Sequence, residues 1–362
     1  MDILPSYTDS LRADILPSYS DSLMHHGIKG MHWGIRRYQD YGGRLTYAGK
    51  LRYYGKTYKQ LSKSDKEDVM IAAKNNGIKI NKKTDISYSD PKKNPNYDPK
   101  TGLVKKSKNS TPEQDAEMIN PGIVDKRFLS DNSRYQFNCT HCTIAYDLRR
   151  RGYDVAASPV KSAEGEDAKF IEKMYKHAEK RNAEPVLKSK QVRNTSLLSN
   201  PPMSDKEYEN LWTESFNHAI NDPRSYDKAC KQQGKKILNT CESYGPNARG
   251  NIMIKLACGG GHSLAFENDA KGRTKFIDTQ TYNSYRNKTN TAGDSTSKYY
   301  RNIICMADPY FDSVVLRYDN AKPNYKFITD NNIVCNPRTV TCKNKSIFGK
   351  EETSKFTQYQ YE

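Results

Sequence analysis

The sequence predicts an α+β fold, in which a helix-rich half precedes a half built of antiparallel strands. Helix start and stop signals concentrate before residue 243, and short strand-like segments separated by glycine-rich turns follow between residues 251 and 318. The composition also changes after Gly122, because the preceding stretch is polar and rich in turn residues. The folded domain is therefore expected over residues 121–330.

The helices of the first half follow from capping residues and periodicity. Asn138 is a typical N-cap residue and Gly152 a typical C′ residue, which predicts a helix from Cys139 to Arg151. Ser204 is a second candidate cap, and apolar residues recur after it at helical spacing. The other predicted helices cover residues 163–181, 204–220 and 225–243.

Strand signals dominate the second half. Short apolar runs alternate with polar residues there, and turns containing Gly, Asn or Asp separate them. The predicted strands cover residues 153–157, 251–257, 262–267, 275–278, 302–308 and 313–318.

The rest of the chain is expected to lie outside the folded domain. Residues 1–63 form a basic leader that begins with a repeat, because residues 2–11 recur with one substitution at 14–23. Two copies are too few for a repeat architecture, so a duplicated tail is favoured over a doubled docking peptide. Residues 64–120 are predicted to be a polar linker or arm, and residues 331–362 a polar C-terminal tail.

The formal net charge of +17 indicates acidic partners. The leader contains a strongly basic stretch, in which nine Lys and Arg residues between Met24 and Lys63 accompany a single acidic residue, Asp40. Tyrosines are interleaved with these cations, a pattern that can grip a nucleic-acid strand or bind an acidic protein surface. The alternative is a basic tail that only keeps the chain soluble.

The start of the chain lacks the basic and apolar regions of a secretory signal, and no apolar run is long enough to span a membrane. A cytoplasmic or virion-associated protein is therefore expected. The leader residues from His26 to Gly34 read His-Gly-Ile-Lys-Gly-Met-His-Trp-Gly. This segment resembles a short motif of head-associated and structural proteins of phages of Gram-positive bacteria, which implies phage head proteins as partners.

The eight cysteines are too sparse for a disulfide scaffold, and without a signal peptide most are expected to be free thiols. Cys139 and Cys142 form half of a zinc site at most, because no second Cys-x-x-Cys or spaced histidine pair completes it. The leader histidines also lack a nearby Cys or acid at ligand spacing. No metal site is therefore expected.

Three residues carry the predicted chemistry: Cys139 at a helix start, His262 after three glycines, and Asp278 at the end of the next strand. A helix N-terminus favours the thiolate form of a cysteine, and its N–H groups can stabilise an oxyanion. A cysteine nucleophile also needs a base that a third group orients. The order Cys, His, Asp is the papain-like arrangement.

The residues from Asn138 to Val155 read Asn-Cys-x-x-Cys-x-x-Ala-Tyr-x-Leu-Arg-Arg-Arg-Gly-Tyr-Asp-Val. This motif, the Gly-Gly-His ending at His262 and the Ile-Asp-x-Gln from Ile277 to Gln280 resemble the papain-fold toxin family of protein-glutamine deamidases. The resemblance covers about half the chain. The Ser-Leu-Ala-Phe after His262 departs from many relatives, which affects substrate contacts rather than the catalytic residues.

The resemblance implies a papain-like domain in which Cys139, His262 and Asp278 act as a catalytic triad. It implies that Gln280 contacts the substrate or the oxyanion, and Asn138 is placed with it. The nucleophile itself stays open at this point. Gln136 precedes Cys142 by the six residues typical of papain-type proteases, whereas Cys142 also lies on a core-facing ridge of the predicted helix.

The leading hypothesis is a cysteine-dependent hydrolase that deamidates glutamine side chains of a protein substrate, as a phage- or prophage-associated effector toxin. This chemistry requires no metal or organic cofactor. A thiol protease is one alternative, because it differs only in which amide is presented. A phage head-associated structural protein with an inert papain-like domain is the other.

Several further residues are predicted to be structural. Cys230, Cys241 and Cys305 are expected in the core, and Cys258 at a strand end. His141 is expected to be exposed in the first helical turn. Arg149, Arg150 and Arg151 are expected on a solvated face at the end of the same helix, where cations suit the helix dipole.

Overall fold

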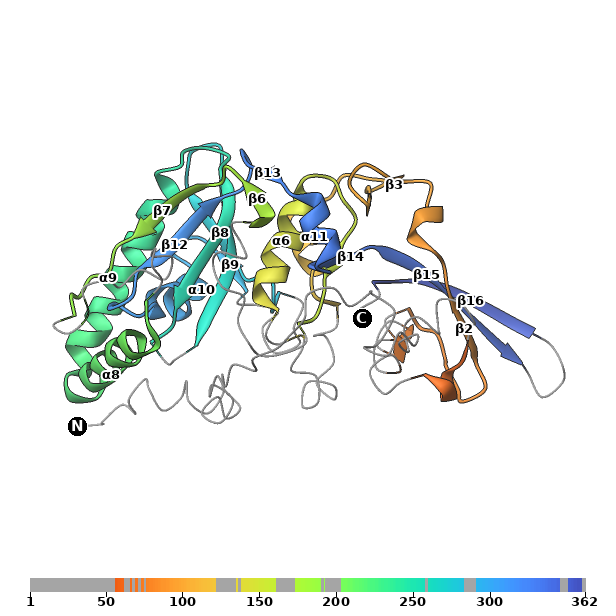
Figure 1. Ribbon diagram of the computed structural model, residues 1–362, viewed down its shortest axis with the longest axis horizontal. Helices are drawn as coiled ribbons and strands as arrows, with labels where there is room; N and C mark the ends of the chain where they lie inside the picture. The colour runs from red at the N-terminus through yellow and green to blue at the C-terminus, as the bar shows by residue number, and fades with distance from the viewer. Residues whose placement is uncertain are drawn as a thin grey trace.

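The computed structural model describes residues 56–61, 66, 69–70, 73–74, 76–121, 135, 138–160, 173–189, 192, 203–257, 260–282, 291–345 and 351–359. The leader repeat, the leader histidines, Gln136 and Cys258 lie outside these residues. Helices and strands are mixed along the described chain, which confirms the α+β class (Figure 1).

The largest sheet has six strands in the order β11-β10-β9-β8-β12-β7, and every neighbouring pair is antiparallel. Its strands are β7 (Glu179–Ala183), β8 (Arg249–Lys255), β9 (Gly261–Asn268), β10 (Thr274–Ile277), β11 (Ala292–Gly293) and β12 (Ser313–Arg317). Four of them, β8, β9, β10 and β12, coincide with predicted strands. Because β7 precedes two long helices in the chain, the strands are not confined to the second half.

Helices cover both faces of this sheet (Figure 1). Alternate residues of a strand point to opposite faces, and β12 shows this alternation directly. Val314 and Leu316 pack with α6 (Cys139–Arg150), whereas Val315 packs with α9 (Pro223–Glu242). Each fully buried side chain of this kind contributes roughly 1.5–3 kcal/mol. The apolar side of α6 therefore holds this helix, and Cys139 with it, against the sheet.

Helices α8 (Asp205–Asn221) and α9 confirm two predicted helices. The Ser204 hydroxyl accepts the N–H of Glu207, and the Glu207 carboxylate accepts the N–H of Ser204, which makes a capping box. Asp222 caps α9, and Pro223 occupies its first position, where no N–H partner is needed.

The helix predicted over residues 163–181 is wrong at its C-terminal end. The chain forms β6 (Tyr175–Lys176) and then β7 there, and His177 between them has a φ of 59°. A left-handed residue interrupts any helix. Pairing of β7 with β12 then outweighs the local helix propensity of its charged residues.

The strand predicted over residues 302–308 is also wrong. Ser297 caps helix α10 (Lys298–Asn302), because its hydroxyl accepts the N–H of Tyr300. A 3-10 turn (Ile304–Met306) follows this helix. Apolar residues in a short run are compatible with either structure, and here they pack against α9 and the sheet.

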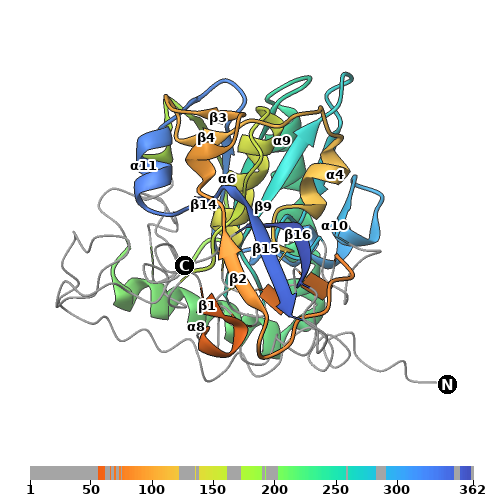
Figure 2. The ribbon, with the colours of Figure 1, turned by 90° about the vertical axis from the view of Figure 1, so that its right-hand side faces the viewer.

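The polar segments at both ends of the predicted domain meet in a second sheet. Its order is β1 (Lys56–Thr57), β2 (Asp85–Tyr88), β15 (Pro337–Lys345) and β16 (Glu351–Tyr359). Figure 2 shows β2, β15 and β16 side by side. Ile86 is buried in the small core of this sheet. The expected arm and tail thus contain paired strands, while the domain boundaries themselves stay a prediction.

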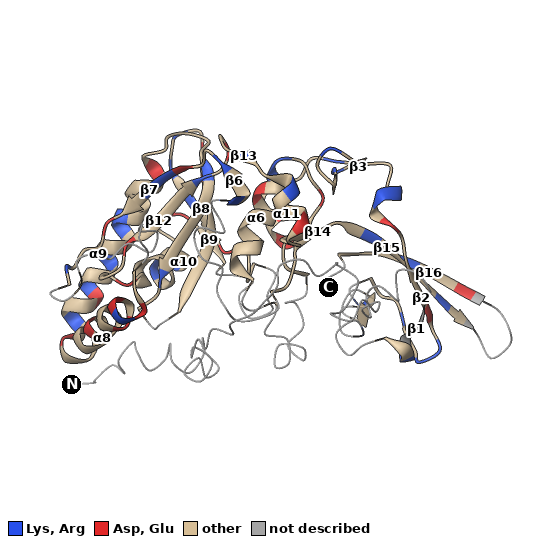
Figure 3. Cartoon of the chain, in the orientation of Figure 1, with Lys and Arg blue, Asp and Glu red and all other residues tan. Residues whose placement is uncertain are grey.

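The remaining elements are short. Two-stranded pairs join β3 (Tyr97–Asp98) to β4 (Leu103–Val104), β5 (Ala156–Ala157) to β14 (Val334–Cys335), and β6 to β13 (Lys322–Pro323). The short helices are α4 (Pro112–Glu117), α11 (Tyr325–Asp330) and the 3-10 turns Tyr58–Gln60 and Pro91–Lys93. Within the described chain, every helix is too short or too polar to cross a lipid bilayer. Basic and acidic residues are interspersed along the elements of Figure 3.

Candidate active site

Cys139 opens helix α6 and is partly exposed. Asn138 occupies the N-cap position with φ −93° and ψ 27°, but its side chain makes no capping hydrogen bond. The predicted N-cap position of Asn138 is confirmed, but its amide makes its hydrogen bonds to other groups instead of capping the helix. The first-turn N–H groups consequently lie beside the Cys139 thiol without a side-chain cap, and such groups favour negative charge.

His262 is the second residue of β9 and pairs with Ile254 of β8. The turn into β9 passes through Gly260, whose φ of 77° disfavours any residue with a Cβ. Nε2 of His262 lies 3.2 Å from Oδ2 of Asp278, and the Cys139 side chain is close enough to the imidazole to raise its pKa. Because Nε2 faces the carboxylate, Nδ1 is the ring atom that remains for the sulfur.

Asp278 directly follows β10, which is the antiparallel neighbour of β9, so the end of one strand lies beside the start of the other. Its Oδ1 accepts the backbone N–H groups of Gln280 and Thr281 at 3.1 and 3.2 Å. Both carboxylate oxygens are thus engaged, and the side chain cannot rotate away from His262 without losing these bonds.

The pKa values of His262 and Asp278 are shifted in opposite directions by their mutual interaction. Burial lowers the pKa of His262, but the Asp278 charge and hydrogen bonds with Asp278 and Cys139 outweigh burial and raise it to about 10. Burial raises the pKa of Asp278, and the His262 charge outweighs it, so this pKa lies below its usual range. The imidazole of His262 is therefore protonated at neutral pH.

Cys142 has a different environment from Cys139. It is fully buried, and its thiol donates to Oδ1 of Asn138 at 3.4 Å. Burial, followed by the charges of Cys139 and Asp278, raises its pKa well above that of an ordinary thiol. A neutral thiol in the core is a poor nucleophile. The geometry therefore favours Cys139 of the two.

A buried network of amides lies behind the three residues. Asn138 and Gln280 are both buried, and Nε2 of Gln280 donates to Oδ1 of Asn138 at 3.4 Å. Asn120 joins them, because its Nδ2 donates to the Asn138 side chain at 3.3 Å and to the Gln280 carbonyl at 3.0 Å. Asn120 was not among the predicted site residues, because no local motif marks it.

His141 is buried rather than exposed, which corrects the sequence prediction. Its Nδ1 lies 2.7 Å from the carbonyl oxygen of Ser158, and Nδ2 of Asn138 donates to the same oxygen at 3.2 Å. The first turn of α6 is therefore attached on this side to the segment that follows β5.

The three arginines at the end of α6 form ion pairs and do not line a solvated face, so that prediction is wrong. Their pairs are Arg149–Asp115 (3.1 Å), Arg150–Glu267 (2.8 Å) and Arg151–Asp147 (2.6 Å). Arg149 is almost fully buried. These pairs fix the end of α6 that is remote from Cys139. Cys230, Cys241 and Cys305 are buried, as expected.

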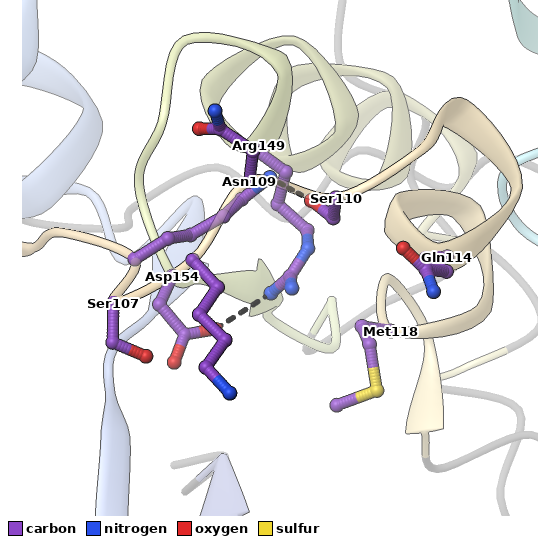
Figure 4. A pocket seen from close by; sticks show the side chains of 9 residues that line it. Ser107, Asn109, Ser110, Gln114, Met118, Arg149 and Asp154 are labelled. Atoms are coloured by element: carbon purple, nitrogen blue, oxygen red, sulfur yellow. Dashed lines mark hydrogen bonds and ion pairs between the residues drawn. The ribbon is translucent and has the colours of Figure 1, made fainter.

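A cavity of about 240 Å³ lies at this same end of α6 (Figure 4). Lys106, Lys108 and Arg149 contribute cations to its lining, and Arg149 is paired with Asp154 at 2.8 Å. Arg149 follows Cys139 by ten residues, which is about 15 Å along a helix. The cavity is therefore separate from the candidate active site.

No cluster of three or more His, Cys, Asp or Glu side chains with metal-binding geometry occurs among the described residues. All seven cysteines in that part of the chain are free thiols, including Cys335 and Cys342 of the predicted tail.

Two family models match the chain. Residues 17–40, in the leader, match a family of unknown function. No curated protein and no solved structure matches the chain. Residues 137–282 match a family described as papain fold toxin 1, glutamine deamidase. This segment, which contains Cys139, His262 and Asp278, is therefore similar to deamidase toxins at the level of the family.

Proposed function

We propose that this chain is a cysteine hydrolase that deamidates glutamine side chains of a protein substrate, with Cys139, His262 and Asp278 as its triad. The observation that carries the proposal is the position of His262. Its imidazole lies 3.2 Å from the Asp278 carboxylate and close enough to the Cys139 side chain for that side chain to raise its pKa. The family match over residues 137–282 supports the glutamine carboxamide as the bond attacked.

In the first half-reaction, the Cys139 thiolate attacks the side-chain carboxamide carbon of glutamine. A carbon–sulfur bond forms, and the carbonyl oxygen becomes an oxyanion. The His262 imidazolium donates its proton to the amide nitrogen, the carbon–nitrogen bond breaks, and ammonia leaves. The product of this step is a thioester between Cys139 and the substrate side chain.

In the second half-reaction, the now neutral His262 accepts a proton from water, and the water oxygen attacks the thioester carbon. The carbon–sulfur bond breaks, Cys139 leaves as the thiolate, and His262 is again an imidazolium. Glutamine and water have become glutamate and ammonia. Asp278 stabilises the imidazolium and keeps the ring oriented in both halves.

The oxyanion needs donors beside the sulfur. The first-turn N–H groups of α6 have this position, and the Asn138 side chain does not cap them. Asn138 and Gln280 were expected to contact the substrate or the oxyanion, yet both side chains are buried and bonded to each other. In this proposal, the two side chains hold the start of α6 in place through their buried hydrogen bond and do not contact the substrate.

We place the activity in a phage- or prophage-associated effector toxin. The toxin family that residues 137–282 match supports the effector, and the leader motif from His26 to Gly34 supports the phage context. The basic leader would then serve as a docking segment for phage head proteins or nucleic acid. Induced expression in bacteria should arrest growth, and Cys139→Ala should abolish the arrest. Equal arrest by the variant would argue against an enzymatic toxin.

The direct test is mass spectrometry of lysate proteins treated with the full chain. Deamidation predicts Gln-to-Glu conversion that Cys139→Ala abolishes and Cys142→Ala retains, and the modified peptides would name the substrate. New peptide termini without conversion would indicate a thiol protease instead. If the folded protein gives neither signal and its Cys139 is unreactive, the inert structural alternative is favoured.

A further inference from the structure

Asn120 lies on the short segment that follows helix α4, remote in sequence from all three triad residues. Its side chain is 2 % exposed, yet each of its polar atoms is used. Nδ2 donates to the carbonyl oxygens of Tyr135 at 3.1 Å and Gln280 at 3.0 Å, and it contacts Oδ1 of Asn138 at 3.3 Å. Its Oδ1 accepts Nδ2 of Asn138, also at 3.3 Å.

These contacts join the two elements that carry the reacting groups. Asn138 directly precedes Cys139 at the start of α6. Gln280 follows Asp278 by two residues, and its N–H donates to the Asp278 carboxylate. One amide therefore bridges the beginning of the cysteine helix and the loop that holds the carboxylate. This bridge and the direct hydrogen bond from Gln280 to Asn138 connect the elements that carry Cys139 and Asp278, between which His262 lies.

Asn120 is itself held in place by its own segment. The carbonyl oxygen of Ile119 accepts the N–H of Ala157, and Ile119 is fully buried. Ser158, next along the chain, accepts hydrogen bonds from the Asn138 and His141 side chains. Asn120 is therefore held by a network of buried hydrogen bonds. A fully satisfied buried network of this kind is rigid, so it fixes the positions of the residues that it connects.

We infer that Asn120 is a positioning residue, which sets the Cys139–His262–Asp278 geometry by bridging Asn138 and Gln280. The inference rests on the proposed role of the triad. It adds a residue from outside the segment, 137–282, that matches the deamidase family. The catalytic unit of this chain would accordingly begin before residue 120.

The test uses Asn120→Ala in the full chain with Asn268→Ala as the matched control. Asn268 is also a buried amide with three hydrogen bonds, to the Cys241 and Gly245 carbonyls and the Thr274 hydroxyl, but it lies at the far end of β9. Both variants lose comparable packing and hydrogen bonding, so only a positioning role separates them.

The first readout is the rate of Cys139 alkylation by iodoacetamide between pH 5 and 9, followed by peptide mass spectrometry. It reports the Cys139–His262 pair without any knowledge of the substrate. Asn120→Ala should slow alkylation at pH 6 by about 10-fold or more, whereas Asn268→Ala should retain the wild-type pH profile. A misplacement of about 1 Å can lower a reaction rate by roughly 100-fold, so Gln-to-Glu conversion should fall at least as much.

Identical alkylation profiles for wild type and Asn120→Ala would overturn the inference. If Asn120→Ala does not fold, Asn120→Ser replaces it, and a wild-type profile for that variant would overturn the inference equally. If the wild type converts no glutamine while Asn120→Ala still changes the alkylation profile, the deamidase proposal fails and the positioning role stands. If the wild type converts glutamine and Asn120→Ala does so equally well, the positioning role fails and the deamidase proposal stands.

Discussion

Replacing Cys139 and Cys142 by alanine, one at a time, distinguishes the proposed nucleophile from the core cysteine. Cys139 is partly exposed and close to the His262 imidazole, whose pKa it raises, while Cys142 is fully buried and its thiol donates to the Asn138 side chain. Cys139→Ala should therefore remove activity without unfolding the protein. Cys142→Ala should weaken the fold and leave the chemistry in place.

The expected magnitudes follow from these environments. Loss of the nucleophile should lower the conversion rate by at least about 1,000-fold, which corresponds to about 4 kcal/mol of transition-state stabilisation. Because Cys139 is partly exposed, its replacement should change the free energy of unfolding by about 0.5 kcal/mol or less. Removal of the buried Cys142 sulfur and its hydrogen bond should cost about 2 kcal/mol. This corresponds to about 4–8 °C in Tm for a domain of this size.

Two assays measure the two effects independently. Initial rates of Gln-to-Glu conversion in lysate report activity, and thermal unfolding by circular dichroism reports stability. The reasoning would be refuted if Cys142→Ala lost activity while keeping its Tm, because the buried thiol would then take part in the reaction. Retained activity in Cys139→Ala would refute the proposed nucleophile outright.

Four further predictions concern charge, pH, packing and helix capping. Asp278→Asn should lower the pKa of His262 and reduce conversion at neutral pH by about 100-fold, and an unchanged rate would contradict the proposed proton donor. The raised pKa of His262 means that protonated His262 stabilises the fold fully below about pH 6.5, and this stabilisation should disappear as pH rises through about 10. A wild-type minus Asp278→Asn difference in unfolding free energy that grew as pH rose from about 6.5 to about 10 would have the wrong sign. Gly250→Ala should destabilise by about 3 kcal/mol or more, because its Cβ would lie 1.9 Å from the Leu316 carbonyl oxygen. Urea unfolding measures this change, and a wild-type midpoint would show that the strands move apart easily. Ser204→Ala should cost about 1 kcal/mol through loss of the capping box, and thermal unfolding that matched the wild type would mean that the start of α8 is held by packing alone.

Local signals in the sequence were sufficient for much of this fold. Caps and periodicity predicted α6, α8 and α9, because capping groups and apolar spacing act within one or two turns of a helix. Glycine-bounded apolar runs predicted β8, β9, β10 and β12 for the same reason. The candidate residues Cys139, His262 and Asp278 were named from their motifs, and the structure places them in contact.

The errors occur where long-range pairing outweighs local preference. The charged residues of β7 have helical propensity, yet they pair with β12, and the polar strand β2 pairs with β15 more than 240 residues later. No window of sequence contains both partners of such a pair, so neither could be predicted. Packing likewise overturned the expectation for His141, which is hydrogen-bonded to Ser158 in the interior.

The sequence was sufficient to name the candidate reacting groups, because a cysteine at a helix start and a histidine after glycines are local patterns. It could not distinguish Cys139 from Cys142 or identify Asn120. Exposure separates the two cysteines, and burial is a property of the packed fold. Asn120 matters because it lies between the Asn138 amide and the Gln280 carbonyl, and the tertiary structure alone brings residues 120, 138 and 280 within hydrogen-bond distance.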